Sequence, residues 1–230
     1  MFIPFNDTEP NRYGGFPFVT VGLIAVNAAV FFLELFWIQV DPLFFYKYGS
    51  TPAIVLAGSG PAALATITHM FLHGGFSHLF FNMLPLWAFG RRVEDACGPL
   101  RFLLYYLLCG VGADILSTLV RSFVDPNVPG IGASGAIFGV MGAYLVLFPE
   151  GRIRTFFLIW IVPMWPKIRA IWVVLFFIGV QFIPAYMAMN GKGEMSVNYF
   201  AHIGGFLGAL FVHLFLRPEA FARYVSDVGV

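Results

Sequence analysis

Long apolar runs alternate with short polar or glycine- and proline-containing stretches along the chain. Six of these runs are predicted to form helices, and they cover residues 17–39, 76–92, 101–121, 134–148, 168–187 and 198–216. Several approach the ~20 apolar residues that a helix needs to cross a bilayer. The first run contains Asn27 and Glu34, and polar groups in such a helix usually face the bundle interior. The pattern predicts an all-α, polytopic membrane protein with six transmembrane helices.

Two connections are expected to lie at the membrane surface. Residues 41–76 are rich in aromatic side chains and broken by Gly and Pro, and Tyr and Trp are enriched at membrane interfaces. We expect a long interfacial loop with short helical turns there, between the first and second helices. Residues 153–166 are apolar but interrupted by Pro163 and Pro166. They are too short to cross and return, so they are also expected at the interface.

Composition narrows the class of protein further. Hydrophobic residues make up 59% of the 230 residues and charged residues 11%, which is too apolar for an ordinary soluble domain. The expected partner is therefore the lipid bilayer. A net charge of +1 gives no support to a nucleic-acid partner. Cys97 and Cys109 provide neither a disulfide framework nor the CxxC spacing of a zinc site.

The basic residues predict the orientation in the membrane. If the chain crosses the membrane six times, three basic residues (Lys47, Arg121 and Lys192) lie on one side of the membrane and ten lie on the other. The ten are Arg12, Arg91, Arg92, Arg101, Arg152, Arg154, Lys167, Arg169, Arg217 and Arg223. The positive-inside rule then places both termini in the cytoplasm. Residues 1–16 and 218–230 are accordingly predicted as short cytoplasmic tails of a membrane domain that covers residues 17–217.

The fourth run is short and starts at a serine. Residues 134–148 would form a helix of roughly 22 Å, whereas the hydrocarbon core is about 30 Å thick. If its C-terminal end reaches the cytoplasmic face, Ser134 lies beneath the outer surface and the loop before it dips into the membrane. Irregular backbone at that depth is tolerated only where protein buries it or water reaches it. We therefore expect an aqueous cavity above Ser134.

Polar groups from three helices are expected at the depth of this serine. The second, fourth and sixth runs cross the membrane in the same direction, so their N-terminal ends share one level. These ends carry the candidate residues His78, Asn82, Ser134 and His202. His78 and Asn82 are four residues apart and share a helix face. Intramembrane polar groups that meet at one level form a candidate functional site.

Small residues are expected to let the fourth and sixth helices approach closely. They recur at a spacing of four in both runs, at Gly135, Gly139, Ala143, Gly205 and Ala209. Small-xxx-small faces allow helix backbones to come together. We expect the two helices to pack on these faces, which would place Ser134 next to His202.

A serine beside a histidine suits nucleophilic catalysis. His202 can take the proton of Ser134 as general base and can later protonate the leaving amine. The Ser134 backbone N–H, His78 and the Asn82 side-chain amide can stabilise the oxyanion. No carboxylate stands at an obvious position to orient His202. Asp114 is the one deep candidate for a third member, and a Ser–His dyad does not require it.

Three motifs resemble the signature of rhomboid intramembrane serine proteases, namely Gly132-x-Ser134-Gly135, His78-x-x-x-Asn82, and His202 followed by Gly205. Residues 67–78 and the stretch Val93-Glu94-Asp95 are also similar to that family. GxSG alone is short and common, but its combination with the other two motifs in this order is specific. The resemblance covers about residues 17–217.

The resemblance implies a rhomboid-like bundle of six helices with a Ser134–His202 dyad and an oxyanion site that includes His78 and Asn82. It implies hydrolysis of a peptide bond in or near the transmembrane segment of a single-span membrane protein, in a bacterial inner membrane. No metal or organic cofactor is expected. The sequence carries no signature of an oligomeric state.

The resemblance also assigns supporting positions. Gly132, Gly135 and Gly205 belong to its motifs. Phe138 stands where the family often has a tyrosine stacked on the catalytic histidine, and its ring is still expected to pack on His202. The fifth helix resembles the family's proposed gate.

Other interpretations of the same residues remain open. Ser134 could be a helix N-cap, and His202 could be a buried hydrogen-bonding histidine. The spacing of His69 and His73 can suit zinc, but no carboxylate or cysteine lies nearby in sequence, so a structural role is favoured. The whole protein could be a non-catalytic rhomboid-like membrane adaptor. It could also be a small transporter, although we find no inverted repeat.

Overall fold

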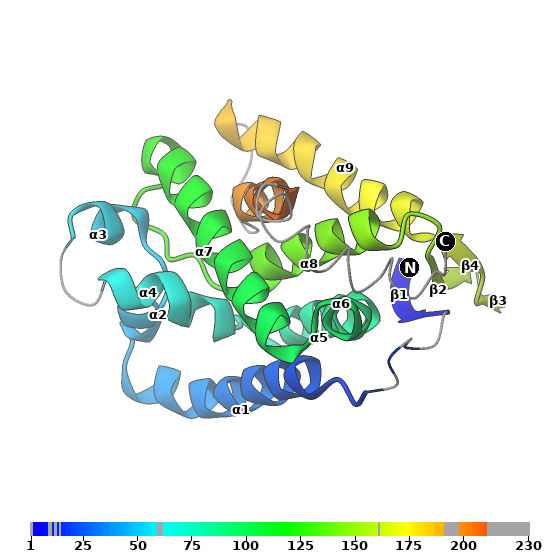
Figure 1. The fold of residues 1–230 in the computed structure, drawn as a ribbon. Helices are drawn as coiled ribbons and strands as arrows, with labels where there is room; N and C mark the ends of the chain where they lie inside the picture. Colours follow the sequence, from blue (N-terminus) through cyan, green and yellow to red (C-terminus); the bar gives the residue numbers. More distant parts are fainter. Residues whose placement is uncertain are drawn as a thin grey trace.

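The computed structural model describes residues 2–8, 11, 13, 15–58, 62–160, 162–190 and 198–210. Figure 1 shows a bundle of helices with a small β-sheet at one end. Helix α8 (Ser134–Leu147) lies in the middle of the bundle, with α1 (Phe18–Val40) on one side and α9 (Ala170–Met189) on the other. Because α8 begins at Ser134, the packing around this central helix decides what surrounds the serine.

The remaining long elements follow the predicted order. They are α5 (Phe76–Pro85), a π-helical stretch (Leu86–Gly90), α6 (Arg91–Cys97), α7 (Pro99–Val124) and the helix Tyr199–Leu210. The prediction of a mostly helical chain is confirmed. Among the described residues, α1, α7 and Ala170–Met187 are long and apolar enough to cross a membrane. The count of six spans stays a prediction, and residues 211–230, including the predicted tail 218–230, lie outside the described residues.

The described part of the long connection after α1 contains short helices, as predicted. These are α2 (Phe44–Tyr48), α3 (Pro52–Leu56), α4 (Ala62–Thr68) and a 3-10 turn (His69–Phe71). The connection also holds the loop before α8: Ser50 and Gly130 exchange N–H···O bonds of 2.9 and 2.7 Å, and the Gly132 N–H donates to the His69 carbonyl at 2.8 Å. Irregular backbone next to Ser134 is thereby satisfied within the protein.

Small residues bring α8 and the helix Tyr199–Leu210 into backbone contact. A Cβ added to Gly205 would lie 1.9 Å from the Gly135 carbonyl oxygen, and one added to Gly142 would lie 2.9 Å from the Cβ of Ala209. The Tyr105 hydroxyl joins the same layer, since it donates to the Gly139 carbonyl at 3.1 Å. The predicted packing of the fourth and sixth helices on their glycine faces is confirmed.

The first helix begins at a cap that comes from a distant part of the chain. Glu94 of α6 is buried, and its carboxylate accepts the Val19 N–H at 2.9 Å and both the N–H and the hydroxyl of Thr20 at 2.7 Å. The first N–H groups of a helix lack intrahelical partners, and Pro17 at the N-cap of α1 has no side-chain oxygen to supply one. Glu94 therefore joins α6 to α1. Glu94 in the Val93-Glu94-Asp95 stretch thus has a structural role as the cap of α1.

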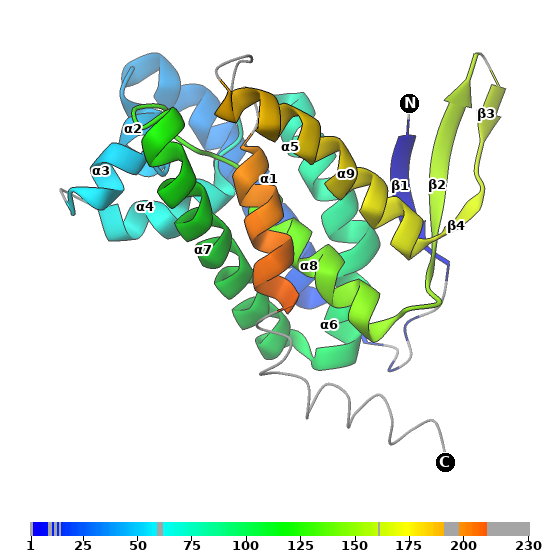
Figure 2. The same cartoon turned by 90° about the horizontal axis from the view of Figure 1, so that it is seen from above.

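An antiparallel sheet adds an element that the sequence did not predict. It consists of β1 (Phe2–Asp7), β2 (Arg152–Ile159), β3 (Val162–Met164) and β4 (Lys167–Arg169). Strand β1 pairs with β2, so the N-terminal segment predicted as a tail joins the segment predicted as an interfacial connection. The Tyr144 hydroxyl donates to Asp7 Oδ2 at 2.8 Å, and Arg91 donates to the Asp7 carbonyl at 3.0 Å. These bonds join the sheet to the bundle, and Figure 2 shows the sheet at one side of the helices, next to the start of α9.

Gly205→Ala should separate α8 from the helix Tyr199–Leu210, because the new Cβ would overlap the Gly135 carbonyl oxygen. Overpacking of this kind costs about 1–3 kcal/mol, so the thermal unfolding midpoint in detergent should fall. Gly208→Ala is the matched control on the same helix, since a Cβ there would meet nothing within 4 Å. Equal unfolding midpoints for the two variants would contradict the close contact.

Candidate functional site

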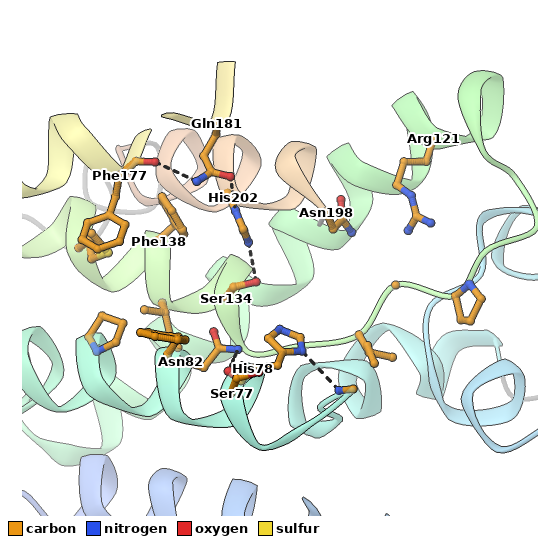
Figure 3. Close-up of a pocket in the computed structure, with 18 of the residues that line it drawn as sticks. Ser77, His78, Asn82, Arg121, Ser134, Phe138, Phe177, Gln181, Asn198 and His202 are labelled. Carbon is orange, nitrogen blue, oxygen red and sulfur yellow. Dashed lines mark hydrogen bonds between the residues drawn. The ribbon is translucent and has the colours of Figure 1, made fainter. Parts of the chain in front are cut away.

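The hydroxyl of Ser134 points at the ring of His202, as Figure 3 shows. Ser134 Oγ and His202 Nε2 are 2.7 Å apart, and His202 Nδ1 is 2.9 Å from Gln181 Oε1. An amide oxygen can only accept a hydrogen bond, so Nδ1 carries the ring proton and Nε2 accepts the Ser134 O–H. The structure therefore brings together the two residues that were expected to meet. It does so in the tautomer that a general base requires.

Ser134 does not act as a helix N-cap. The N-cap position of α8 is Ala133, and within the described part of the chain no side chain caps this end. The Ser134 oxygen instead bonds to His202. The N–H groups at the start of α8 are thus not occupied by a capping side chain, and the helix dipole favours negative charge there.

Phe138 fixes the plane of the His202 ring. The two rings are stacked with centroids 4.5 Å apart and an interplanar angle of 9°. Phe138 is one turn after Ser134 on α8, so a single helix supplies both the hydroxyl and the stacking surface. The ring packs on the histidine as expected, without the hydroxyl of a tyrosine.

Helix α5 supplies a polar wall opposite the histidine. His78 Nδ1 accepts the Gly74 N–H at 3.4 Å, which leaves the ring proton on Nε2. The Asn82 Nδ2 group donates to the His78 carbonyl at 3.1 Å and has a second N–H. His78 and Asn82 both line the cavity beside Ser134 (Figure 3), so each can offer an N–H to a group bound there.

Gly132 allows the loop to pass close to His78. Its φ of +123° lies in a region that side chains rarely adopt, and an added Cβ would lie 2.9 Å from His78 Nε2. Glycine is therefore required by both backbone conformation and space. This accounts for the first position of the Gly132-x-Ser134-Gly135 motif.

A cavity of about 630 Å³ opens beside the serine. Its wall includes the candidate residues and others, among them Ser134, His202, His78, Asn82, Phe138 and Gln181. The cavity is therefore bounded by the hydrogen-bonded pair of Ser134 and His202 on one side and by hydrogen-bond donors on the other. A cavity beside Ser134 was expected from the shortness of the fourth run.

The other deep polar residues make contacts elsewhere. Asp114 Oδ1 is 3.9 Å from His69 Nε2, and His69 Nδ1 is 3.0 Å from the Ala65 carbonyl oxygen. Gln181, and not Asp114, occupies the Nδ1 side of His202. The alternative in which Asp114 is the third member of a triad is thus not supported by its contacts.

His73 has a structural setting. Its N–H donates to Glu34 Oε2 at 2.9 Å, and its ring lies edge-on to His78 with centroids 5.1 Å apart. Burial, with a smaller effect of His78, lowers the pKa of His73 to about 4, so the ring is neutral near pH 7. In the described residues no group of three or more His, Cys, Asp and Glu side chains is placed to hold a metal ion.

Two residues of the site were missed from the sequence. Gln181 contacts His202, and Asn198 accepts the Ser117 hydroxyl at 2.7 Å and the Ala201 N–H at 3.2 Å at the start of the last described helix. A signal for Gln181 was present, because it is the only amide side chain in the apolar helix α9. Polar side chains in such helices tend to be functional.

A family model described as the Rhomboid domain matches residues 62–219. The chain belongs to the rhomboid family. As a rhomboid it is a membrane protein, in agreement with its apolar helices. The serine, the histidine and the two α5 residues described above all lie within the matched region.

Curated relatives carry rhomboid names. Rhomboid protease GluP of Bacillus subtilis (strain 168) is 36% identical over 150 residues, which cover 63% of this chain and 24% of that protein. Rhomboid protein 1, mitochondrial, of Saccharomyces cerevisiae is 29% identical over 192 residues, which cover 82% of this chain and 51% of that protein. Presenilin-associated rhomboid-like protein, mitochondrial, of Rattus norvegicus is 31% identical over 194 residues, which cover 83% of this chain and 45% of that protein. This rhomboid spans about half of these relatives or less.

Phe138→Ala should slow the reaction of Ser134 with a fluorophosphonate probe, because the histidine loses its stacking partner. Aromatic pairs contribute about 0.5–1.5 kcal/mol, which corresponds to a rate lower by roughly 2- to 10-fold. Phe138→Tyr keeps the stack and should react at a rate close to wild type. Phe138→Leu controls for side-chain volume and should resemble the alanine variant. An unchanged rate in Phe138→Ala would show that the stack does not position the base.

Proposed function

We propose that this rhomboid is an intramembrane serine endopeptidase that hydrolyses a peptide bond in or near the transmembrane segment of a single-span membrane protein. The observation that carries the proposal is the 2.7 Å contact between Ser134 Oγ and His202 Nε2 on the wall of a cavity. The similarity to a relative named a rhomboid protease supports it. No cofactor takes part in the proposed reaction.

In the first half-reaction His202 removes the Ser134 proton while Oγ attacks the carbonyl carbon of the scissile bond. The carbonyl oxygen becomes an oxyanion. The Ser134 N–H at the start of α8, the Nε2–H of His78 and the free N–H of Asn82 are the candidate donors for it. The imidazolium then gives its proton to the leaving nitrogen, and the C–N bond breaks to leave an acyl-enzyme.

In the second half-reaction water replaces the amine. His202 takes a proton from the water, whose oxygen attacks the acyl carbon, and the same donors stabilise the second oxyanion. The proton then returns to Ser134 Oγ as the ester bond breaks. The products are a new carboxyl group and a new amine, and the dyad is restored.

The cavity accounts for how water can serve this reaction inside a membrane. Its wall combines apolar side chains, such as Phe81 and Ile137, with the polar groups of the site. Such a wall can hold an unwound peptide segment while the donors orient its carbonyl group. A transporter would also need polar groups within apolar helices, but it would not need a serine hydroxyl that donates to the unprotonated ring nitrogen of a histidine.

The direct test is cleavage of a generic single-span substrate after reconstitution into vesicles. Ser134→Ala should lose roughly 10³-fold or more of the activity, because it removes the nucleophile. Ser122→Ala is a control, since this half-buried α7 serine lies outside the site and donates to the Leu119 carbonyl. Equal cleavage by wild type and Ser134→Ala would rule out the proposed nucleophile. Absence of both cleavage and probe labelling in wild type would favour the non-catalytic adaptor.

We also propose a bacterial inner-membrane location with both termini in the cytoplasm. Pairing of β2 with β4 sets Arg152 opposite Arg169 and Arg154 opposite Lys167. Arg91 and Arg92 approach the same sheet through Asp7. Six of the ten basic residues assigned to the cytoplasmic face thus gather around one sheet, which supports a single cationic side.

Protease accessibility of an epitope tag at the C-terminus tests this orientation. The tag should be protected in intact spheroplasts and digested in inverted inner-membrane vesicles. Digestion in spheroplasts and protection in inverted vesicles would reverse the proposed orientation.

A further inference from the structure

One polar side chain of α9 reaches the catalytic histidine. Gln181 Oε1 lies 2.9 Å from His202 Nδ1, and Gln181 Nε2 donates to the Phe177 carbonyl at 3.1 Å. Figure 3 shows the side chain extending from α9 toward His202, with Ser134 on the far side of the ring. The three residues therefore form a continuous chain from α9 to the nucleophile.

The Phe177 carbonyl decides which way the amide of Gln181 points. A carbonyl oxygen accepts and cannot donate, so the amide nitrogen must face Phe177 and the amide oxygen must face His202. The reversed amide would set two oxygens against each other. With the amide oxygen toward it, Nδ1 must be the protonated nitrogen. The lone pair of Nε2 is then directed at Ser134.

We propose that Gln181 is the positioning residue of the base, an uncharged third member that selects the tautomer of His202 and stabilises the imidazolium formed when Ser134 gives up its proton. This inference rests on the proposed serine protease function. The amide oxygen carries partial negative charge, so it stabilises the protonated ring less strongly than a carboxylate would. In return it avoids the desolvation of a full negative charge in an apolar bundle.

Few other groups can perform this role. His202 is 7% exposed, so water has little access to its ring. Among the residues described, the titratable or charged side chains that share its cavity are His78 of α5 and Arg121 of α7. The neighbours from α8, Ser134 and Phe138, bear no charge; Ser134 bonds to Nε2, and Phe138 stacks on the ring and has no group that can hydrogen-bond to Nδ1. The state of Nδ1 therefore depends on Gln181.

The contact also links the base to the seating of α9. On this helix the side chains next to Gln181 are largely exposed, including Val180, Phe182 and Ile183, whereas Val173, Val174 and Ile178 are buried closer to its start. Ala185, one turn after Gln181, is also buried, so α9 is packed on both sides of Gln181, and the hydrogen bond to His202 adds a polar contact between them. Displacement of this part of α9 would remove the acceptor from Nδ1 and weaken the base.

The test compares Gln181→Leu and Gln181→Glu with wild type in detergent. The readouts are the rate of fluorophosphonate labelling of Ser134 as a function of pH, and kcat and KM for a single-span substrate. Gln181→Leu removes the acceptor at similar volume, so the plateau rate should fall by roughly 3- to 10-fold. Because the imidazolium is less stabilised, the acid limb of the profile should move to lower pH. The effect should appear in kcat more than in KM.

Gln181→Glu keeps an acceptor and adds negative charge, so the labelling rate should recover toward wild type and the acid limb should move to higher pH. Ile183→Ala is the control on the same helix, since Ile183 is 69% exposed, and it should match wild type. A shift of the acid limb to lower pH in Gln181→Leu and to higher pH in Gln181→Glu supports a positioning role. A common fall in rate with no shift of either limb would overturn it and leave only a structural role.

A second measurement does not need activity. In protein labelled with 15N-histidine, the His202 nitrogen signals should report a protonated Nδ1 in wild type and a mixture of tautomers in Gln181→Leu. Identical signals would overturn the inference even if the leucine variant proved unstable in assays. A different result would show that the proposed function itself is wrong: wild type and Ser134→Ala would then be labelled equally by the probe.

Discussion

The contact between the backbones of α8 and the helix Tyr199–Leu210 is the constraint on which the site depends. Gly205 meets the carbonyl of Gly135 so closely that no side chain fits between them. Gly135 directly follows Ser134, and Gly205 is less than one turn after His202. The close approach therefore sets the distance between hydroxyl and imidazole. Lipid tails are as apolar as leucine, so backbone packing and hydrogen bonds must hold these helices together.

Once the helices have met, the imidazole is restrained in two independent ways. Phe138 stacks on its face and fixes the plane of the ring, while Gln181 bonds to its edge and fixes the position of the proton. The hydroxyl is restrained through the backbone before it, because the His69 carbonyl holds the Gly132 N–H. Three segments far apart in the chain thus converge on the hydrogen bond between Ser134 and His202. A displacement of any one of them would lengthen it.

Much of this site could be predicted from the sequence because the surrounding helices are so apolar. In such a background Ser134, His202, His78 and Asn82 stand out, and the direction of each span gives their depth. Gln181 was missed for a physical reason. Apart from Gln181, helix α9 is apolar on all sides, so its sequence singles out the amide but does not indicate which face of the helix turns inward. Only the packed structure shows that Gln181 faces the histidine.

The sheet and the cap of α1 were missed for a different reason. Around Ile153 the chain alternates between exposed arginines and buried residues, which is the period of a strand, but the stretch is short and its partner β1 is far away in sequence. Glu94 likewise caps a helix far away in the sequence, since its partner Thr20 lies 74 residues earlier. Interactions over such separations leave no local pattern. Sequence reasoning therefore recovers the elements better than the contacts that join them.

A shared arrangement explains how polar side chains can serve a site within apolar helices. His78, Asn82 and Gln181 each use one polar atom to bond a backbone group four residues earlier, at Gly74, His78 and Phe177. The other polar group of each side chain is then directed into the cavity or at His202. Burying a polar side chain without partners would cost several kcal/mol, and the backbone bond offsets part of this cost. Because that bond also fixes the orientation of the ring or amide, the same contact that makes these residues tolerable in the bundle leaves them directed at His202 or into the cavity beside Ser134.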